Sequence, residues 1–561
     1  MLTPSIALAA LTSLAPSALQ ASPAAQEARA DAERPFLYYD YLENGVLKGG
    51  QIVVIPGSPL LEQVGEIGPP TEAPSTTILS NGPPTNRIDI VLVGDGYRSQ
   101  DLGAYASHCS SLVNNFFLQP PLSNYKTFFN VHRVDVVSVD QGVDNDPTQG
   151  VLKNTALDMG FWCNGVERAL CVNVNKAITE AGSAPQRDQV LALANSTKYG
   201  GVGYPSNNLG TLAAANGAAL EIALHEFGHS FAKLADEYDY GGPTTYGGGE
   251  PGQRNISTLV SAAMSSTQSK WWRWIGTGGV STFEGAGYSQ FGLYRPTNDS
   301  KMRNLGRPFE QVNTEQFVIY FYRTVDPIDS ATPAGTYPPN TTLNVDPVDP
   351  VSHALTVQWT RNGVAIPGAT GSSLDVASLG LQPGLHTIGV TVVDNTNLVR
   401  DEAARAQWMS ETREWTIDVP GIVSSYCAGK LNSDGCVPSV GWTGAPSVSS
   451  ASPFDVRCFD VVPFKNGLLF YGYAPKNSPF QGGTLCVQPP TRRTAPQGSG
   501  GFPPPDYCSG AYSYDFNARI QSGVDANLVA GATVYGQWWY RDPSASFTVG
   551  LSNGISFVIG N

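Results

Sequence analysis

The distribution of apolar and polar residues divides the chain into a mixed helix–strand region followed by β-rich regions. Three apolar runs have the length and composition of buried strands, at residues 87–93, 129–137 and 189–194. Helix-forming composition or helical periodicity marks residues 102–117, 211–229 and 313–324. This order of elements predicts an α/β (α+β) domain over residues 81–328.

Beyond residue 328 the pattern changes to short runs in which apolar and polar residues alternate. Leu355–Trp359 and Gly384–Asp394 alternate like the strands of a sandwich, with turn residues between them. They predict an immunoglobulin-like β-sandwich over residues 329–420. Residues 421–561 contain further strand-like runs among many glycines and prolines, and predict a C-terminal β-rich domain. The fold class is therefore multidomain, with β-sandwich domains after the mixed domain.

The N-terminal segment has the features of an export signal. Residues 1–25 combine an apolar stretch with small residues near a possible cleavage point, which predicts a signal peptide. Residues 26–80 are predicted to form a short N-terminal β and linker segment. No other stretch is long and apolar enough to span a bilayer. We therefore expect a secreted or extracellular protein, or one located in the periplasm or at the cell surface.

Composition and charge narrow the class of partner. The chain has 60 glycines, 42 prolines and only 14% charged residues, which is typical of turn-rich extracellular modules. Its formal net charge of −14 argues against nucleic acid or an anionic membrane surface as a partner.

Eight cysteines also fit an exported protein. Cys163 and Cys171 are close enough in the sequence to close a local loop. An odd number of cysteines lies on each side of residue 330. Either one cysteine is free on each side, or one bridge crosses between them.

The most informative motif is His225-Glu-Phe-Gly-His229, because it has the spacing H-E-x-x-H within a predicted helix. Residues four apart lie on one face of a helix, so both imidazoles can reach one zinc ion. Glu226 then lies beside the metal, where it can act as a general base toward water. A buried helix with two merely hydrogen-bonded histidines is the alternative interpretation.

A zinc site needs a third protein ligand, and no histidine follows His229 for more than a hundred residues. The nearest candidates are the carboxylates of Asp236, Glu237 and Asp239, with Asp236 first in the chain. A distant glutamate, for which Glu250 or Glu284 would serve, is a further alternative.

Three other groups of residues are candidates for supporting roles. Met302 lies in a turn before the last predicted helix, which is where metzincins place a methionine below the metal. Asp95 and Tyr97 follow the first strand and are interpreted as structural. The acidic stretch Asp140–Asp146 offers a weakly supported calcium site.

These motifs together resemble the IgA-peptidase family of zinc metallopeptidases, a metzincin-like group. The resemblance covers residues 86–328. It implies a zincin-like domain with endopeptidase activity, His225, His229 and Asp236 as zinc ligands, and Glu226 as the base. The segments that carry the resemblance are Val93–Tyr97, Tyr199–Gly201, His225–Phe231, Leu234–Tyr238, and Tyr294–Pro296 with Met302.

The sequence departs from the metzincin pattern at one place. The third ligand of that pattern would fall at Ala235, and Asp236 comes one residue later. Lys233 is therefore interpreted as a one-residue insertion in the turn after the helix. The departure leaves the third ligand open between Asp236 and Glu237.

The expected function is a secreted zinc endopeptidase that acts on protein or peptide substrates. Zinc activates a water molecule, Glu226 moves its proton to the leaving amine, and Tyr294 is the candidate for holding the oxyanion. Two alternatives remain, an inactive zincin scaffold that serves as a surface adhesin and a different zinc amide hydrolase. The C-terminal domains could contact cell-surface or extracellular polymers.

Overall fold

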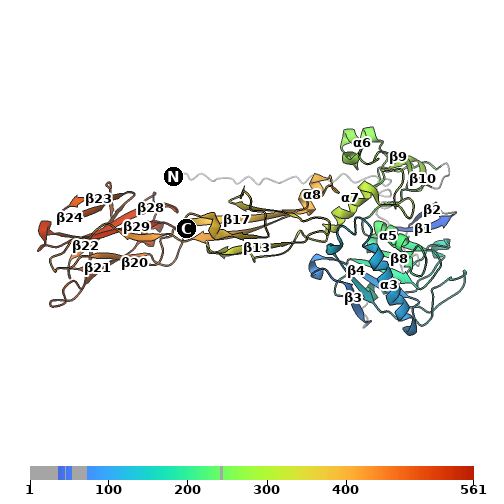
Figure 1. Ribbon diagram of the computed structural model, residues 1–561, viewed down its shortest axis with the longest axis horizontal. Coiled ribbons are helices and arrows are strands. Elements are labelled where there is room, and N and C mark those ends of the chain that lie inside the picture. Colours follow the sequence, from blue (N-terminus) through green and yellow to red (C-terminus); the bar gives the residue numbers. More distant parts are fainter. Residues whose placement is uncertain (1–35, 44–45, 54–72, 240–243) are drawn as a thin grey trace, which may run out of the picture. The chain divides into compact units, whose positions relative to one another are not determined.

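The computed structural model describes residues 36–43, 46–53, 73–239 and 244–561, and the chain divides into two compact units. Unit 1 extends to Val325 and also includes residues 350–353 and 396–404, whereas unit 2 holds the remaining residues from Asp326 onward. Both units are rich in strands (Figure 1). Among the described residues, no helix has the length and apolar character needed to cross a membrane. The predicted signal peptide, residues 1–25, lies outside the described residues.

The framework of unit 1 is an eight-stranded mixed sheet in the order β2-β1-β7-β8-β6-β4-β5-β3. Strands β8, β6, β4 and β5 are parallel to one another, and β1, β7 and β3 each pair antiparallel with their neighbours. The central strands are buried on both faces, which explains why they read as continuous apolar runs. The strands are β1 (Phe36–Glu43), β2 (Val46–Val53), β3 (Ser75–Leu79), β4 (Ile88–Asp95), β5 (Phe129–Val134), β6 (Gln189–Ala194), β7 (Gly201–Tyr204) and β8 (Leu209–Ala213).

Helices cover both faces of this sheet. Along β4, Val91 and Val93 share a core with α4 (Val174–Ala181). The alternate residues Ile90 and Leu92 instead face α3 (Leu102–Phe116). Because successive side chains of a strand point to opposite faces, the apolar run of β4 supplies both cores.

The other elements of unit 1 follow the sheet in sequence. They are α5 (Ala219–Ser230), α6 (Ser261–Thr267), the hairpin of β9 (Phe283–Ala286) and β10 (Ser289–Arg295), and α7 (Glu310–Phe321). The predicted helix over residues 313–324 is thus present as α7, with its start three residues earlier.

The predicted helix over residues 211–229 is wrong in its first half. Residues up to Ala213 belong to β8, which pairs with β6 on one side and β7 on the other. The helix begins only at Ala219. The helix-forming composition is overridden because every residue of β8 is buried within the sheet.

The first part of unit 2 consists of two sheets that share one core. One sheet has the order β11-β13-β16 and the other β12-β18-β17-β14-β15. Trp359 and Trp415 stack in the core with ring centroids 5.6 Å apart. An immunoglobulin-like connectivity stays a prediction. The strands are β11 (Ile328–Ala331), β12 (Thr336–Tyr337), β13 (Thr342–Pro347), β14 (Thr356–Arg361), β15 (Val364–Ala365), β16 (Ser373–Asp375), β17 (Gly384–Val393) and β18 (Ser410–Val419), with α8 (Glu402–Trp408) before β18.

The C-terminal part of unit 2 has its own core around Trp538 and Phe557. Its main sheet has the order β19-β29-β28-β22-β25, with β26 also paired to β22. A second sheet has the order β20-β21-β27, and β23 and β24 form a separate hairpin. The elements are β19 (Val423–Tyr426), β20 (Ser439–Thr443), β21 (Asp455–Val461), β22 (Asn466–Gly472), β23 (Pro475–Phe480), β24 (Gly483–Val487), β25 (Arg492–Arg493), β26 (Gln497–Gly498), β27 (Gly510–Asp515), α9 (Phe516–Gln521), β28 (Thr533–Arg541) and β29 (Val549–Val558).

Six of the eight cysteines form disulfides within one unit each. The predicted local bridge Cys163–Cys171 is present in unit 1. Unit 2 holds two further bridges, Cys427–Cys486 and Cys436–Cys508. Cys109 and Cys458 are free and buried. Of the two arrangements that the cysteine count allowed, the structure therefore has one free cysteine on each side of residue 330.

Candidate metal centre

Helix α5 presents both histidines of the motif toward one point. His225 and His229 are one helical turn apart and both are buried. The Nδ1 of His225 lies 3.0 Å from the carbonyl oxygen of Lys301, and that of His229 lies 2.8 Å from the carbonyl oxygen of Leu234. A carbonyl only accepts, so each imidazole carries a proton on Nδ1, and Nε2 is the nitrogen left to bind a metal ion. This is the orientation that metal-binding histidines have in proteins.

The atoms that converge at this point are all acceptors. The two Nε2 atoms are 3.0 Å apart, and Asp236 Oδ1 lies 3.2 Å from one and 3.3 Å from the other. Asp40 Oδ2, from β1, lies 2.9 Å from the Nε2 of His225. One ligand atom from each of these four buried residues falls within 4.8 Å of the others. Lone pairs and carboxylates this close need a positive charge between them, which either a proton on Nε2 or a metal ion supplies, so the donor set fits a bound metal ion.

The pKa values of His225 and Asp236 reflect the attraction between the imidazoles and the carboxylates. Burial by itself would lower the pKa of His225, but the carboxylates of Asp40 and Asp236 outweigh it and raise that pKa well above its ordinary value. Burial opposes ionisation of Asp236, yet His229 and His225 hold the pKa of Asp236 below its usual range. The site therefore keeps Asp236 as a carboxylate.

The two adjacent acids, Asp236 and Glu237, point to different surroundings. Asp236 is in the cluster, whereas Glu237 accepts hydrogen bonds from Asn255 at 3.0 Å, Asn313 at 2.8 Å and Ser300 at 2.6 Å. Of the other third-ligand candidates, the carboxylate of Asp239 lies against Gly285, Glu250 pairs with Lys270, and Glu284 accepts from the backbone of Gly292.

The turn after α5 explains how Asp236 reaches the centre. The helix ends at Ser230, and Lys233 adopts a left-handed backbone with φ of 57°. Its ammonium group binds the carbonyls of Pro205 and Ser230 and the side chain of Asn208, at 2.5 to 2.6 Å. The Lys233 insertion is thus accommodated within the turn, which still delivers Asp236 to the histidines.

Glu226 lies on the side of α5 that faces the glycines of β7 and β8. A Cβ atom added at Gly201 or Gly203 would come within 3.0 Å of its carboxylate oxygens, so only glycine leaves room there. Glu226 is buried, and both of its oxygens lack a hydrogen-bond partner among the described residues. Burial, and then the charge of Asp40, raise the pKa of Glu226 well above its ordinary value. Such a carboxylate is suited to accepting a proton.

Three tyrosines surround the cluster. Tyr38 stacks on the ring of His229, with centroids 3.9 Å apart and an interplanar angle of 8°. Tyr238 donates a hydrogen bond to Asp40, and Tyr288 donates one to Asp236. Tyr294 lies half-buried on β10, where its backbone pairs with Ser257. The role of Tyr294 in holding the oxyanion stays a prediction.

The turn around Met302 lies against the metal helix. Met302 is buried, and a Cβ atom added at Gly228 of α5 would lie 2.6 Å from its sulfur. The carbonyl of Met302 accepts from the backbone of Glu237 at 2.8 Å, and Lys301 forms an ion pair with Glu221 of α5. The turn therefore contacts both α5 and the segment after it that carries Asp236.

Asp40, Tyr38 and Tyr288 are not among the residues predicted for the site. Residues 26–80 were predicted to form a short β and linker segment, but nothing in them indicated a contact with the motif helix. Asp95 accepts from the backbone of Leu157 and Met159 at 2.9 and 2.8 Å, which is a structural environment. Asp140 and Asp144 likewise accept backbone N–H groups, and calcium binding there stays a prediction.

Comparison with known protein families gives a match within unit 1. Residues 76–281 match the model of the IgA Peptidase M64 family. The predicted resemblance is confirmed for this stretch, which contains the histidine motif and Asp236. No curated protein matches the chain.

The solved structures similar to this chain have low sequence identity and low TM-scores. A quinonprotein alcohol dehydrogenase-like protein from Bacteroides thetaiotaomicron has 10% identity and a TM-score of 0.12, over 22% of this chain and 35% of that chain. CBM51-2 and INT domains of ZmpB from Clostridium perfringens, solved with GlcNAc, have 9% identity and a TM-score of 0.09, over 41% of this chain and 43% of that chain. The M60 catalytic domain of ZmpB with two CBM51 domains has 9% identity and a TM-score of 0.09, over 51% and 23%. The chain spans less than half the length of each, and these likenesses carry no conclusion.

Proposed function

We propose that the region matched by the M64 family model, residues 76–281, is the core of a zinc-dependent endopeptidase that hydrolyses peptide bonds in protein substrates. The observation that carries this proposal is the convergence of two Nε2 lone pairs and the Asp236 carboxylate, with the buried Glu226 next to them on the same helix. Two imidazoles and one carboxylate are a donor set that catalytic zinc uses. His225, His229 and Asp236 would hold the ion.

Each residue of the site has a separate role in the proposed hydrolysis. When bound, zinc supplies a Lewis acid that polarises the scissile carbonyl and acidifies water. Glu226 takes the proton of the attacking water and transfers it to the leaving amine. Its raised pKa favours keeping the proton between these two transfers. Tyr288 holds Asp236 in place through its hydrogen bond, and Tyr294 remains the candidate for contacting the oxyanion.

The disulfides support a location outside the cytoplasm. Three bridges in one chain favour an oxidising compartment. We therefore propose a secreted or surface-located peptidase.

The test compares proteolysis of unfolded casein by the parent, by Glu226→Gln and by Glu284→Gln, with the zinc content of each measured. Glu226→Gln should bind one zinc and lose cleavage, because the base is gone and the ligands remain. Glu284→Gln is the matched control, and it should equal the parent in zinc content and in activity.

Cleavage by Glu226→Gln at the parental rate, or no zinc in any of the three proteins, would overturn the proposal. Where the zinc-loaded parent is inert, the assay is repeated with zinc-loaded Asp40→Ala. Inertness of that variant as well would also overturn it.

A further inference from the structure

The outer face of the C-terminal sheet carries a cleft with an aromatic floor. Leu468 pairs with Trp539 across β22 and β28, and Phe470 pairs with Arg493 across β22 and β25. Because side chains alternate along a strand, these four lie on the same face of the sheet. The intervening Trp538 is fully buried in the core on the other face.

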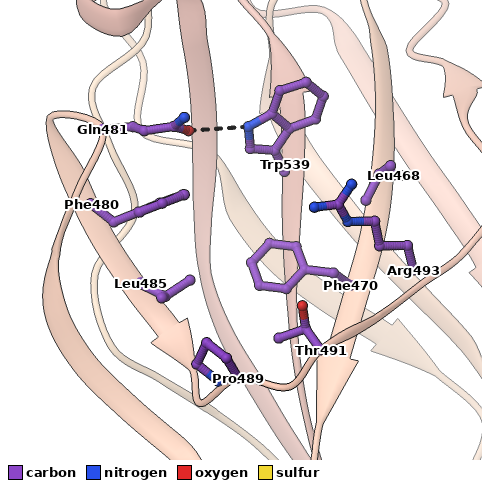
Figure 2. A pocket seen from close by; sticks show the side chains of 9 residues that line it. All are labelled: Leu468, Phe470, Phe480, Gln481, Leu485, Pro489, Thr491, Arg493 and Trp539. Carbon is purple, nitrogen blue, oxygen red and sulfur yellow. Dashed lines mark hydrogen bonds between the residues drawn. The ribbon is translucent and has the colours of Figure 1, made fainter.

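The β23–β24 hairpin forms the wall opposite this floor. Phe480, Gln481 and Leu485 of the hairpin region face Trp539 and Phe470, as Figure 2 shows. The enclosed volume is about 320 Å³. The Gln481 amide oxygen accepts a hydrogen bond of 3.4 Å from the Trp539 indole, which links wall and floor.

The wall is fixed independently of any ligand. The Gln537 side chain donates to the carbonyl of Thr484 at 2.8 Å and accepts from the backbone of Cys486 at 3.0 Å. The Cys427–Cys486 disulfide ties the same strand to β19's end. A cleft with fixed walls costs little ordering when a ligand enters.

Two polar side chains in the cleft have no partner among the described residues. These are the Arg493 guanidinium and the Thr491 hydroxyl, both of which line the cleft in Figure 2. The neighbouring Arg492, by contrast, forms an ion pair of 2.6 Å with Asp525. Arg493 is exposed to solvent beside the half-buried Trp539 ring, so its guanidinium is free to bind an anionic group that enters the cleft.

We propose that this cleft binds a saccharide unit that carries a carboxylate. The C–H face of a pyranose ring packs on the Trp539 and Phe470 rings, and its hydroxyls bond to Thr491 and to the free N–H groups of Gln481. The Arg493 fork binds the carboxylate. A volume of about 320 Å³ is at the lower end of small-molecule pockets, which run from roughly 300 to 1,000 Å³.

Other ligand classes fit less well. An extended peptide adds to a free strand edge, but β22 at the floor pairs with β28 on one side and with β25 and β26 on the other. The edge strand beside the cleft, β25, is only two residues long and offers little backbone for a peptide to pair with. The acidic balance of the chain disfavours nucleic acid.

The experiment titrates the full chain with D-glucuronate, N-acetylneuraminate, D-glucose and an oligoglutamate peptide, followed by ligand-observed NMR. We expect at least one of the acidic sugars to bind, and D-glucose to bind more weakly. Arg493→Gln should weaken acidic-sugar binding about tenfold or more, because a charge-assisted pair is lost. Trp539→Ala should abolish it. Arg541→Gln, an exposed arginine on the same strand, is the charge-matched control and should change nothing.

Binding of neither acidic sugar would overturn the proposal, and oligoglutamate binding that depends on Trp539 would then make the cleft a peptide site. Glucose binding as tight as that of the acidic sugars would also overturn it. Retained sugar binding by Trp539→Ala would move the site elsewhere and overturn it too.

A second, independent observation concerns the strand that brings Asp40 to the metal centre. Without β1, the strand β7 would form the edge of the described sheet, since its other partner is β8. β1 pairs with β7 in the antiparallel direction, with Tyr38 opposite Gly203 and Tyr39 opposite Val202. This register places Tyr38 on His229 and Asp40 next to His225.

The packing of β1 against the centre is close on every side. A Cβ atom added at Gly203 would lie 2.9 Å from atoms of Glu226 and His229, and one at Gly49 of β2 would meet Asp40 and Tyr238. With Asp40, four protein groups surround the position of the ion. Catalytic zinc sites keep one position open, whereas sites with four protein ligands are closed.

We infer that the β1–β2 hairpin holds the centre in a latent state, with Asp40 in the place that water needs. This inference rests on the proposed peptidase function. Displacement of the hairpin would free one position at the ion and the edge of β7 together, so a single movement opens the site.

The test uses full-length parent, Asp40→Ala and Asp158→Ala loaded with cobalt in place of zinc. Cobalt reports its ligands through visible absorption, independently of activity. We expect a changed spectrum and at least about tenfold tighter binding of acetohydroxamate in Asp40→Ala than in the parent. The exposed Asp158→Ala should match the parent.

An unchanged spectrum and an unchanged hydroxamate affinity in Asp40→Ala would overturn the latency. Loss of cobalt from Asp40→Ala would do the same, because Asp40 would then be needed to retain the ion. A parent that binds no cobalt would instead overturn the proposed function itself.

Discussion

At the scale of single residues, the turn after α5 decides which acid reaches the candidate metal centre. Asp236 is held by Tyr288 within reach of both histidines, and Glu237 is enclosed by Asn255, Asn313 and Ser300. Asp236→Ala should lower zinc affinity by more than about 100-fold, beyond the effect of removing a supporting hydrogen bond. Glu237→Gln should retain one zinc, because its oxygens do not face the cluster. Metal analysis after dialysis against a weak chelator measures both, and stoichiometric zinc in Asp236→Ala would refute the assignment.

Gly228 permits the contact between α5 and Met302. Gly228→Ala should destabilise the protein by about 1–3 kcal/mol, because the new methyl would lie 2.6 Å from the Met302 sulfur. Helix propensity alone would predict a gain of about 1 kcal/mol from the same change. Gly217→Ala, whose Cβ would meet nothing within 4 Å, is the control and should be neutral. Denaturant unfolding compares the two, and equal stability of both variants would show that Met302 yields freely.

A sequence can bring residues together in a prediction where the geometry is local. His225, Glu226 and His229 lie within five residues of one helix, so helical periodicity alone places them together. Asp40 was missed because only the pairing of β1 with β7 brings it to His225, and strand pairing leaves no local signal. Tyr288 was missed because it occupies the β9–β10 turn with φ of 65°, a backbone conformation that the surrounding sequence does not indicate.

At the scale of elements, β4 and β6 were predictable from the sequence, and β7 and β8 were not. β4 and β6 are continuous apolar runs. β7 contains two glycines in four residues, which reads as a loop, and β8 has the composition of a helix. Both are strands because their backbones pair within the sheet, and the glycines are required where Glu226 approaches.

The β23–β24 hairpin depends on its disulfide. Replacing Cys427 and Cys486 by serine should cost about 2–4 kcal/mol and loosen the hairpin, because the bridge restrains a long segment of unfolded chain. Hydrogen exchange of the β24 amides should accelerate. Replacing Cys163 and Cys171 should cost less, since those residues are separated by 8 positions rather than 59. Unchanged protection of β24 in the first variant would mean that the Gln537 hydrogen bonds alone hold the hairpin.

At the scale of the whole molecule, the separate cores predict separate unfolding. Unit 1 has its core around the mixed sheet, and unit 2 has two further cores in its own sheets. The metal centre uses residues of unit 1 alone. A ligand that binds only the folded state stabilises the part that it binds, by about 4 kcal/mol at a concentration 1,000 times the Kd.

Calorimetry of the zinc-loaded chain should therefore show more than one transition, and EDTA should lower only the one that belongs to unit 1. The expected shift is several degrees, since about 1 kcal/mol moves the Tm of a large domain by roughly 2–4 °C. Glu226→Gln keeps the metal ligands, so EDTA should lower the Tm of its unit 1 transition as much as in the parent. In Asp236→Ala, the unit 1 transition should already have the lower Tm, and EDTA should not change it. A shift of every transition by EDTA, or of none in a protein that carries zinc, would contradict a stabilising ion held within unit 1 alone.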